Sequence, residues 1–321
     1  MTIDLNVLAR QLLSFLSMVA VGFCAVKFRL ISAELHDALS GLLMRLIMPA
    51  LLITSFISMD VVGSGLLGSI VVGSLVLYVL QFTLGGLTAL LMGQRGDYLG
   101  AHVYCSMFGS IGFFAIPLLG TLFGSEALLA CSLYMMMDGI VVCTLGMRLA
   151  TGHAQKDTSR MDRKQRIKHK LAQVFNPPFV STLIGLGLSF LPLSKENVVV
   201  QAVSEIGSGS TALAMLFIGG NLARSSFKGL LKNWRVIGIP AVKMLAVPIL
   251  AYVILNRLGF PSNAATYLAL LACVPISPIS AIYCRENGSE AYGFCSVASV
   301  VTVCMSMVTI PIVGYLLNTL G

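Results

Sequence analysis

Charged residues are scarce in this chain. Asp, Glu, Lys and Arg make up only 11% of the 321 residues, whereas 57% of the residues are hydrophobic. The mean hydropathy is correspondingly high, at +0.90. Because soluble globular domains carry about 25% charged residues, this composition excludes a soluble domain and indicates an integral membrane protein.

Several functional motifs are also missing. The eight cysteines include no C-x-x-C pair and the four histidines form no metal-ligand cluster, so we expect no metal site and no cofactor. The chain has no Walker A motif, so ATP is not expected to drive it directly. It also lacks a second midplane aspartate to pair with Asp138, and a G-x-S-G motif with a midplane histidine. We therefore do not expect an enzyme.

The chain consists largely of long apolar runs. Each is long enough to cross about 30 Å of hydrocarbon, which takes roughly 20 helical residues. The first run lacks a basic n-region and a small-x-small cleavage site, so we interpret it as a retained helix and not as a signal peptide. The sequence predicts an all-α integral membrane protein with ten transmembrane helices, at residues 5–26, 37–57, 63–92, 99–123, 127–148, 172–192, 198–221, 234–255, 262–283 and 291–317.

Basic residues are distributed unevenly between the loops. With the N-terminus outside, the inside loops hold sixteen Lys and Arg residues and the outside loops hold only Lys195 and Arg257. The positive-inside rule then predicts a multi-pass protein of the cell (inner) membrane with both termini outside. Residues 151–171 form the one long polar stretch. We interpret them as a basic cytoplasmic linker, in preference to a site for nucleic acid or anionic lipid head groups.

The linker divides the chain into two halves, residues 1–150 and 172–321, with five predicted helices each. An odd number of helices gives the two halves opposite orientations. The sequence GSEA at 124–127 recurs 164 residues later at 288–291, and the following Cys-Ser pair recurs with it. These matches predict two inverted five-helix repeats.

Glycine and proline interrupt the fourth and the ninth predicted helix. The segments are GSIGFFAIP at 109–117 and VPISPISA at 274–281, and the offset of 164 residues superposes them. Interrupted helices leave backbone groups that lipid cannot satisfy, so they survive in a membrane only where they line a protein cavity. A matching pair of interruptions is typical of the binding site of a secondary transporter. We therefore predict that helices 4 and 9 are broken and cross each other.

The two crossed helices supply the candidate substrate site. Proline suits the first turn of a helix, so Pro117, and Pro275 or Pro278, are expected to start second half-helices. The N-terminus of a half-helix presents free N–H groups and partial positive charge, which suit a carboxylate. The alternative is a pair of simple kinks in packed helices. The predicted substrate-binding residues are Gly109, Ser110, Gly112, Pro117, Pro275, Ser277, Pro278 and Ser280.

The ionisable residues within the predicted helices include Asp138, Lys243 and Arg45. A charge at the bilayer centre costs about 2.5–3.5 kcal/mol on insertion scales, so each is a candidate for coupling or for charge neutralisation. Three roles are open for Asp138: it carries a coupled proton, it orients the substrate site, or it is a structural partner. Three are open for Lys243 as well: it pairs with Asp138, it neutralises a substrate carboxylate, or it extends to the membrane surface. Arg45 either reaches the cytoplasmic rim or contacts the substrate.

Six motifs, in order along nearly the whole chain, resemble those of the auxin efflux carrier family. That family includes bacterial malonate- and malate-type permeases and the plant PIN carriers. The motifs are GFCAVKFRLIS, RLIMPALL, GFFAIPLLGTLFG, FNPPF, ALAMLFIGGNL and VPISPISAIYCRENGSEA. The resemblance implies ten spans in two inverted repeats, transport of organic anions and a site where helices 4 and 9 cross. Related carriers often have Asn where this chain has Ser110. The first family proline of helix 9 corresponds to Pro275, and a later one falls on Ser280.

Two functions remain in competition. The preferred one is a permease that carries a small organic anion, a mono- or dicarboxylate, by alternating access around the crossed helices. The alternative is an ion or proton antiporter of similar architecture that depends on Asp138 and Lys243. The expected partners are the substrate anion and the lipid bilayer, with no nucleic acid. Whether the chain forms a homodimer stays open.

Overall fold

The computed structural model describes residues 3–57, 65–146, 148–149, 175, 177–191, 193–194, 196–224, 234–277, 280–281, 284 and 289–320. Within these residues, all regular structure is helical apart from one isolated antiparallel bridge. Seven helices are long and apolar enough to cross a membrane: Leu5–Lys27, Glu34–Ser55, Leu66–Leu91, Ser125–Gly146, Val198–Arg224, Arg235–Arg257 and Tyr292–Leu320. Three shorter apolar helices are Ile111–Phe123, Pro177–Ser189 and Ser262–Cys273.

These helices agree with the predicted membrane protein. Each predicted segment coincides with one long helix or contains one of the three shorter ones. The number of crossings, ten, stays a prediction, because only seven helices within the described residues reach the length of a span. The basic linker at 151–171 lies outside the described residues, as does Pro278.

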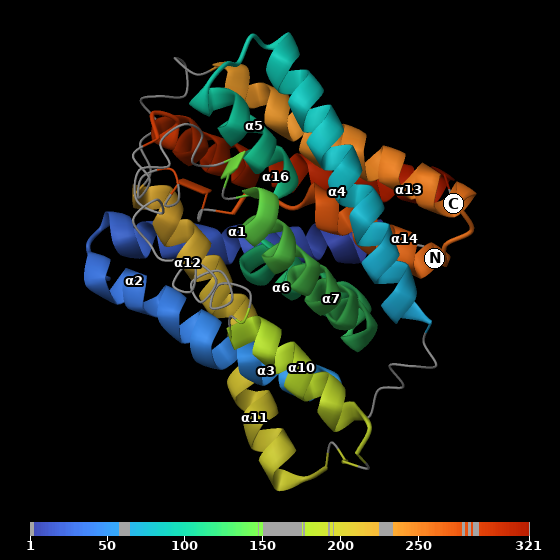
Figure 1. Cartoon of the computed structure of the whole chain (residues 1–321). Coiled ribbons are helices and arrows are strands. Elements are labelled where there is room, and N and C mark those ends of the chain that lie inside the picture. Colours follow the sequence, from blue (N-terminus) through green and yellow to red (C-terminus); the bar gives the residue numbers. More distant parts are fainter. Residues whose placement is uncertain are drawn as a thin grey trace, which may run out of the picture.

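The helices pack as two bundles that lie side by side (Figure 1). The α1 bundle contains α1 (Leu5–Lys27), α2 (Ala33–Leu42), η1 (Leu43–Ile47), α3 (Met48–Ser55), α10 (Pro177–Ser189), α11 (Val198–Ser208) and α12 (Ser210–Arg224). The α4 bundle contains α4 (Leu66–Leu91), α5 (Asp97–Met107), η2 (Ile111–Ala115), α6 (Ile116–Phe123), α7 (Ser125–Val141), η3 (Val142–Gly146), η6 (Trp234–Ile237), η7 (Pro240–Ala246), α13 (Val247–Arg257), α14 (Ser262–Cys273) and α16 (Tyr292–Leu320).

The two halves of the sequence interleave in these bundles. Each half contributes its first two predicted segments to the α1 bundle and its last three to the α4 bundle. The halves at 1–150 and 172–321 are therefore not separate in space. An inverted repeat would distribute its helices in this way, and the inverted relation itself stays a prediction.

Proline accompanies most of the irregular helical turns. The π-helical turns η1, η2 and η7 each end two residues before a proline, namely Pro49, Pro117 and Pro248. Proline has no N–H to donate, and its ring clashes with the carbonyl one turn earlier in a regular α-helix. A wider π turn gives the ring room, and such turns occur frequently at functional sites.

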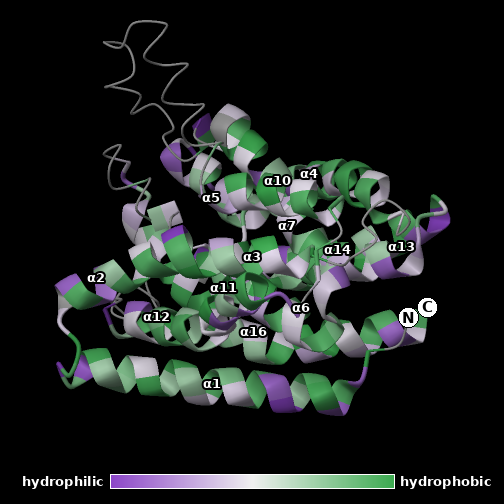
Figure 2. Cartoon of the chain, turned by 90° about the horizontal axis from the view of Figure 1, so that it is seen from below, coloured by the Kyte–Doolittle hydropathy of each residue, from purple (hydrophilic) through white to green (hydrophobic). Residues whose placement is uncertain are grey.

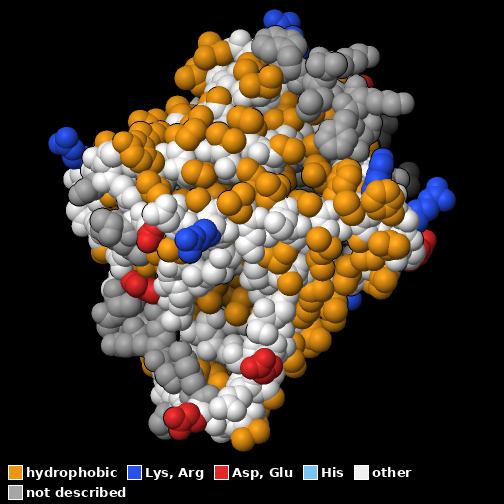
Figure 3. Space-filling model, turned by 180° about the vertical axis from the view of Figure 1, so that it is seen from behind, with side chains coloured by type: hydrophobic (Ala, Val, Ile, Leu, Met, Phe, Trp, Pro, Cys, Tyr) orange, Lys and Arg blue, Asp and Glu red, His pale blue; other side chains and the backbone are white. Residues whose placement is uncertain are grey.

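The outer surface is apolar. Leucine, valine and phenylalanine side chains are widely exposed, including Leu13 at 63% and Leu91 at 79%. Hydrophobic residues predominate along the helices (Figure 2), and hydrophobic side chains cover much of the face in Figure 3, where charged side chains are few and scattered. A surface of this kind suits contact with lipid, as expected of a multi-pass membrane protein.

The two ends of the chain lie together. The backbone of Ile3 donates to Asn318 Oδ1 at 2.7 Å, and Asn318 Nδ2 donates back to the Ile3 carbonyl at 2.7 Å. Both termini therefore lie at the same end of the molecule (Figure 1). This agrees with the prediction that both face the same side of the membrane.

Glycines allow α1 and α12 to approach closely. A Cβ atom at Gly219 would lie 2.0 Å from the Val19 carbonyl oxygen, and one at Gly22 would lie 2.3 Å from that of Leu216. Small residues at such a contact are typical of membrane helix pairs. The α1–α12 contact therefore depends on these two glycines.

We predict that Gly219→Ala destabilises the protein by about 1–3 kcal/mol, because the added methyl group forces the two backbones apart. Thermal unfolding in detergent measures the change. Gly86→Ala in α4 is the matched control, because a Cβ atom there meets nothing within 4 Å. Equal stability of the two variants would contradict the predicted close contact.

Candidate functional site

Both predicted interruptions are present, and they touch each other. Helix α5 ends at Met107 and helix α14 ends at Cys273, and the next residue of each is extended. Gly109 and Ile276 form an antiparallel bridge, and the Ser110 N–H donates to the Pro275 carbonyl at 2.8 Å. A backbone hydrogen bond thus joins the two separated breaks. We call residues 108–110 and 274–277 the crossover.

Gly109 allows this contact. A Cβ atom at position 109 would lie 2.6 Å from Val274 Cγ2 and 3.6 Å from the Pro275 carbonyl oxygen. The extended segments therefore approach more closely than a larger residue would allow. The Ile276 N–H is also satisfied, because it donates to Thr302 Oγ1 of α16 at 3.1 Å.

The second half-helix of segment 4 begins earlier than predicted. The helix resumes at Ile111 and continues through η2 into α6, so Pro117 lies inside it and does not start it. The Phe114 N–H donates to the Ser110 carbonyl at 2.9 Å, as in a first helical turn. The backbone amides of residues 111–113 therefore form the N-terminus of this half-helix, which carries partial positive charge.

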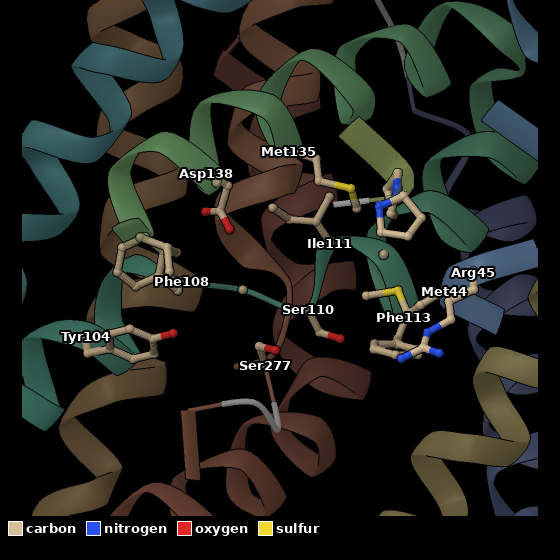
Figure 4. A pocket seen from close by; sticks show the side chains of 16 residues that line it. Met44, Arg45, Tyr104, Phe108, Ser110, Ile111, Phe113, Met135, Asp138 and Ser277 are labelled. Carbon is tan, nitrogen blue, oxygen red and sulfur yellow. The ribbon is translucent and has the colours of Figure 1, made fainter. Parts of the chain in front are cut away.

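A cavity of about 380 Å³ opens beside this N-terminus. Figure 4 shows Ser110 and Ser277 near its centre, with Asp138 to one side and Arg45 to the other. The cavity, which we call cavity 1, is lined by Met44, Arg45, Tyr104, Phe108, Gly109, Ser110, Ile111, Gly112, Phe113, Met135, Asp138, Gly139, Val142, Pro177, Pro178 and Ser277. It therefore lies between the α1 bundle and the α4 bundle.

A second cavity, of about 660 Å³, is also lined by Ser110. This cavity 2 shares Met44, Ser110 and Phe113 with cavity 1 and is also lined by Pro275 and Ile276 of the crossover. Residues from α2, α12 and α16 complete its wall. Ser110 thus lines both cavities.

The Ser110 hydroxyl has no hydrogen-bond partner in the described structure, although the residue is only 4% exposed. A buried polar group without a partner costs about 1–3 kcal/mol. Such a group in a cavity wall is suited to a ligand that completes its hydrogen bonds.

Asp138 is held at the edge of cavity 1 by a partner that the sequence did not reveal. The Tyr78 hydroxyl donates to Asp138 Oδ1 at 2.9 Å. Tyr78 is stacked on Tyr134, with ring centroids 5.3 Å apart, and the Tyr134 hydroxyl lies 3.5 Å from Gln81 Oε1. These contacts fix the carboxylate where it faces the cavity.

The structure brings together only some of the predicted site residues. Gly109, Ser110, Gly112 and Ser277 line cavity 1 with the ionisable residues Asp138 and Arg45, and Pro275 lines cavity 2. Pro117, Ser280 and Lys243 are absent from the described linings of both cavities. Ser280 is buried and donates to the Ser277 carbonyl at 2.8 Å.

A polar cluster that the sequence analysis did not identify lies in the wall of cavity 2. Arg224 at the end of α12 forms an ion pair with Asp37 of α2, and its Nη1 lies 3.0 Å from His36 Nδ1. His36 is buried, stacked on Phe217, and its Nε2 lies 3.1 Å from the Phe217 carbonyl oxygen. These contacts join α2 to α12 and place a cation in the cavity wall.

Comparison with known proteins agrees with this architecture. A family model described as "Membrane transport protein" matches residues 7–314, almost the whole chain. A search of curated proteins found no match. The two broken helices lie within the matched region. The chain belongs to this family of membrane transporters, the auxin efflux carrier family.

Proposed function

We propose that this transporter carries a small organic anion, a mono- or dicarboxylate, and that it binds the anion at the crossover. The observation that carries the proposal is the buried, unpartnered Ser110 hydroxyl at the N-terminus of the half-helix 111–123. Hydroxyl and backbone N–H donors at a helix N-terminus form an anion site.

Guanidinium donors in the cavity walls support an anionic substrate. Arg45 lines cavity 1, and Arg224, which is ion-paired with Asp37, lines cavity 2, so a guanidinium group accompanies Ser110 in each. Asp138 is the acidic residue of cavity 1, and it already accepts a hydrogen bond from Tyr78. A carboxylate at Ser110 would therefore meet donors on several sides.

The position of the cavities supports alternating access. Cavities 1 and 2 lie between the two bundles, toward the end of the molecule where α2, α10 and α16 begin. That end is opposite the chain termini (Figure 1). In the predicted topology it is the cytoplasmic end, so this conformation faces inward. Rocking of the α4 bundle past the α1 bundle would expose the crossover to the other side.

A labelling experiment tests the proposed orientation. In a variant without native cysteines, we expect a membrane-impermeant thiol reagent to label cysteines at positions 2 and 196 from outside sealed cells. A cysteine at position 160 should react only after permeabilisation, because it lies in the basic linker. Labelling at 160 in sealed cells would reverse the orientation.

We predict that Ser110→Ala weakens substrate affinity by about 1 kcal/mol, or roughly fivefold, because one hydrogen bond is lost. Uptake of malonate by proteoliposomes measures the KM. Ser132→Ala is the matched control: Ser132 is buried too, but its hydroxyl bonds to the Leu128 carbonyl of its own helix. An unchanged KM in Ser110→Ala would remove Ser110 from the site.

Asp138 is proposed to carry a coupled proton. We expect Asp138→Asn to abolish pH-driven accumulation but to leave exchange of preloaded substrate intact, because the amide keeps the shape of the side chain and cannot release a proton. Tyr78→Phe should shift the pH dependence of uptake, because it removes the hydrogen bond to the carboxylate. The control is Glu205→Gln in a separate cavity near α11. Unchanged pH dependence in Asp138→Asn would exclude coupling through Asp138.

The second candidate function is an ion or proton antiporter. The observation that favours it is that Asp138 faces cavity 1. Movement of protons across proteoliposome membranes in the absence of any organic substrate would support it, whereas carboxylate-dependent proton movement supports the permease.

A further inference from the structure

Lys243 is a buried cation outside both cavities. It is 0% exposed and lines neither cavity, and no acidic side chain in the described part of the chain forms an ion pair with it. Removing an ammonium group from water costs several kcal/mol unless other contacts offset the loss. The contacts of Lys243 therefore indicate its role.

The ammonium group contacts the end of the first half-helix. Lys243 Nζ donates to the Met107 carbonyl at 3.3 Å, and Met107 is the last residue of α5. The last carbonyls of a helix lack helical donors and carry partial negative charge. A Cβ atom on Gly109 would lie 3.5 Å from Nζ, so the ammonium also lies against the crossover backbone.

The C-terminal end of α14, the other interrupted helix, also contacts η7. Helix α14 ends at Cys273, whose thiol donates to the Met244 carbonyl at 3.1 Å. The residue four positions later, which would donate to this carbonyl in a regular α-helix, is Pro248 and has no N–H. Turn η7, which carries Lys243, therefore contacts the C-terminal ends of both α5 and α14.

The two kinds of helix end face different surroundings. The N-terminus at residues 111–113 faces the cavities, whereas the C-terminal ends at Met107 and Cys273 face η7. A cation beside the C-terminal ends neutralises their partial negative charge. Lys243 itself is absent from the described linings of both cavities.

We propose that Lys243 is a positioning residue, which holds the C-terminal end of α5 in the crossover and does not bind the substrate. The proposal rests on the function proposed above in placing the substrate at Ser110. Loss of the ammonium would leave the Met107 carbonyl without its donor and loosen the crossover. Transport rate and stability should then suffer, whereas substrate affinity should change little.

The test compares Lys243→Met with Lys27→Met. Methionine keeps much of the length of the side chain without its charge, and Lys27 is an exposed lysine at the end of α1. Thermal unfolding in detergent without substrate gives Tm, and uptake of malonate by proteoliposomes gives Vmax and KM. For Lys243→Met we expect a Tm lower by several degrees, a Vmax reduced about tenfold and a KM within about twofold of the wild type. Lys243→Arg, which keeps the charge, should recover part of Vmax, and Lys27→Met should match the wild type.

Two results would overturn the proposal. A KM raised about tenfold with unchanged Tm and Vmax would make Lys243 a substrate ligand, and unchanged values throughout would leave it without a role. If Lys243→Met cannot be recovered folded without substrate while Lys27→Met can, the charge is needed by the fold itself, which supports the proposal. If the wild type takes up no carboxylate, the proposed function fails, whereas the comparison of Tm values still tests Lys243.

Discussion

The backbone contact between the two broken helices is the constraint on which the rest of the site depends. An unsatisfied N–H or C=O group in hydrocarbon costs several kcal/mol, so residues can leave a helix at membrane depth only where other groups pair with them. Here the Ser110 N–H pairs with the Pro275 carbonyl, and the Ile276 N–H pairs with Thr302. Because the chain leaves helix α5 after Met107, a second helix starts at Ile111. Ser110 directly precedes this start and lines both cavities.

Freed carbonyls elsewhere around the crossover are satisfied in the same way. The Lys243 ammonium donates to the Met107 carbonyl at the end of α5, and the Cys273 thiol donates to the Met244 carbonyl. The proline-linked π turns η1, η2 and η7 all lie near the crossover: η1 supplies Arg45 to cavity 1, η2 forms the half-helix N-terminus and η7 carries Lys243. The irregular turns thus bring polar groups to one place inside an apolar fold.

Composition and proline positions were enough to predict a helical membrane protein and the two interruptions, because lipid imposes strict rules on both. They were not enough for the local geometry. Pro117 lies inside the half-helix, where the wider π turn η2 gives its ring room, so its position did not reveal that the helix resumes at Ile111. From the sequence, Tyr78 is expected to be an apolar packing residue. Its hydrogen bond to Asp138 could not be predicted, because the two residues are 60 positions apart in the sequence. Lys243 donates to the backbone carbonyl of Met107, and a contact with a backbone group leaves no pattern of side chains in the sequence from which it could be predicted.

The repeated GSEA motif acquires a physical meaning in the fold. Its first copy begins α7, where Glu126 accepts a hydrogen bond from Asn263 at the start of α14. Its second copy precedes α16, where Ser289 donates to Asp97 at the start of α5. Each copy therefore ties the last helix of one half to the broken helix of the other, as two inverted repeats would require. Because these ties lie within the α4 bundle, a motion of that bundle past the α1 bundle would carry both broken helices together. The crossover contacts could then survive the change of access that we propose.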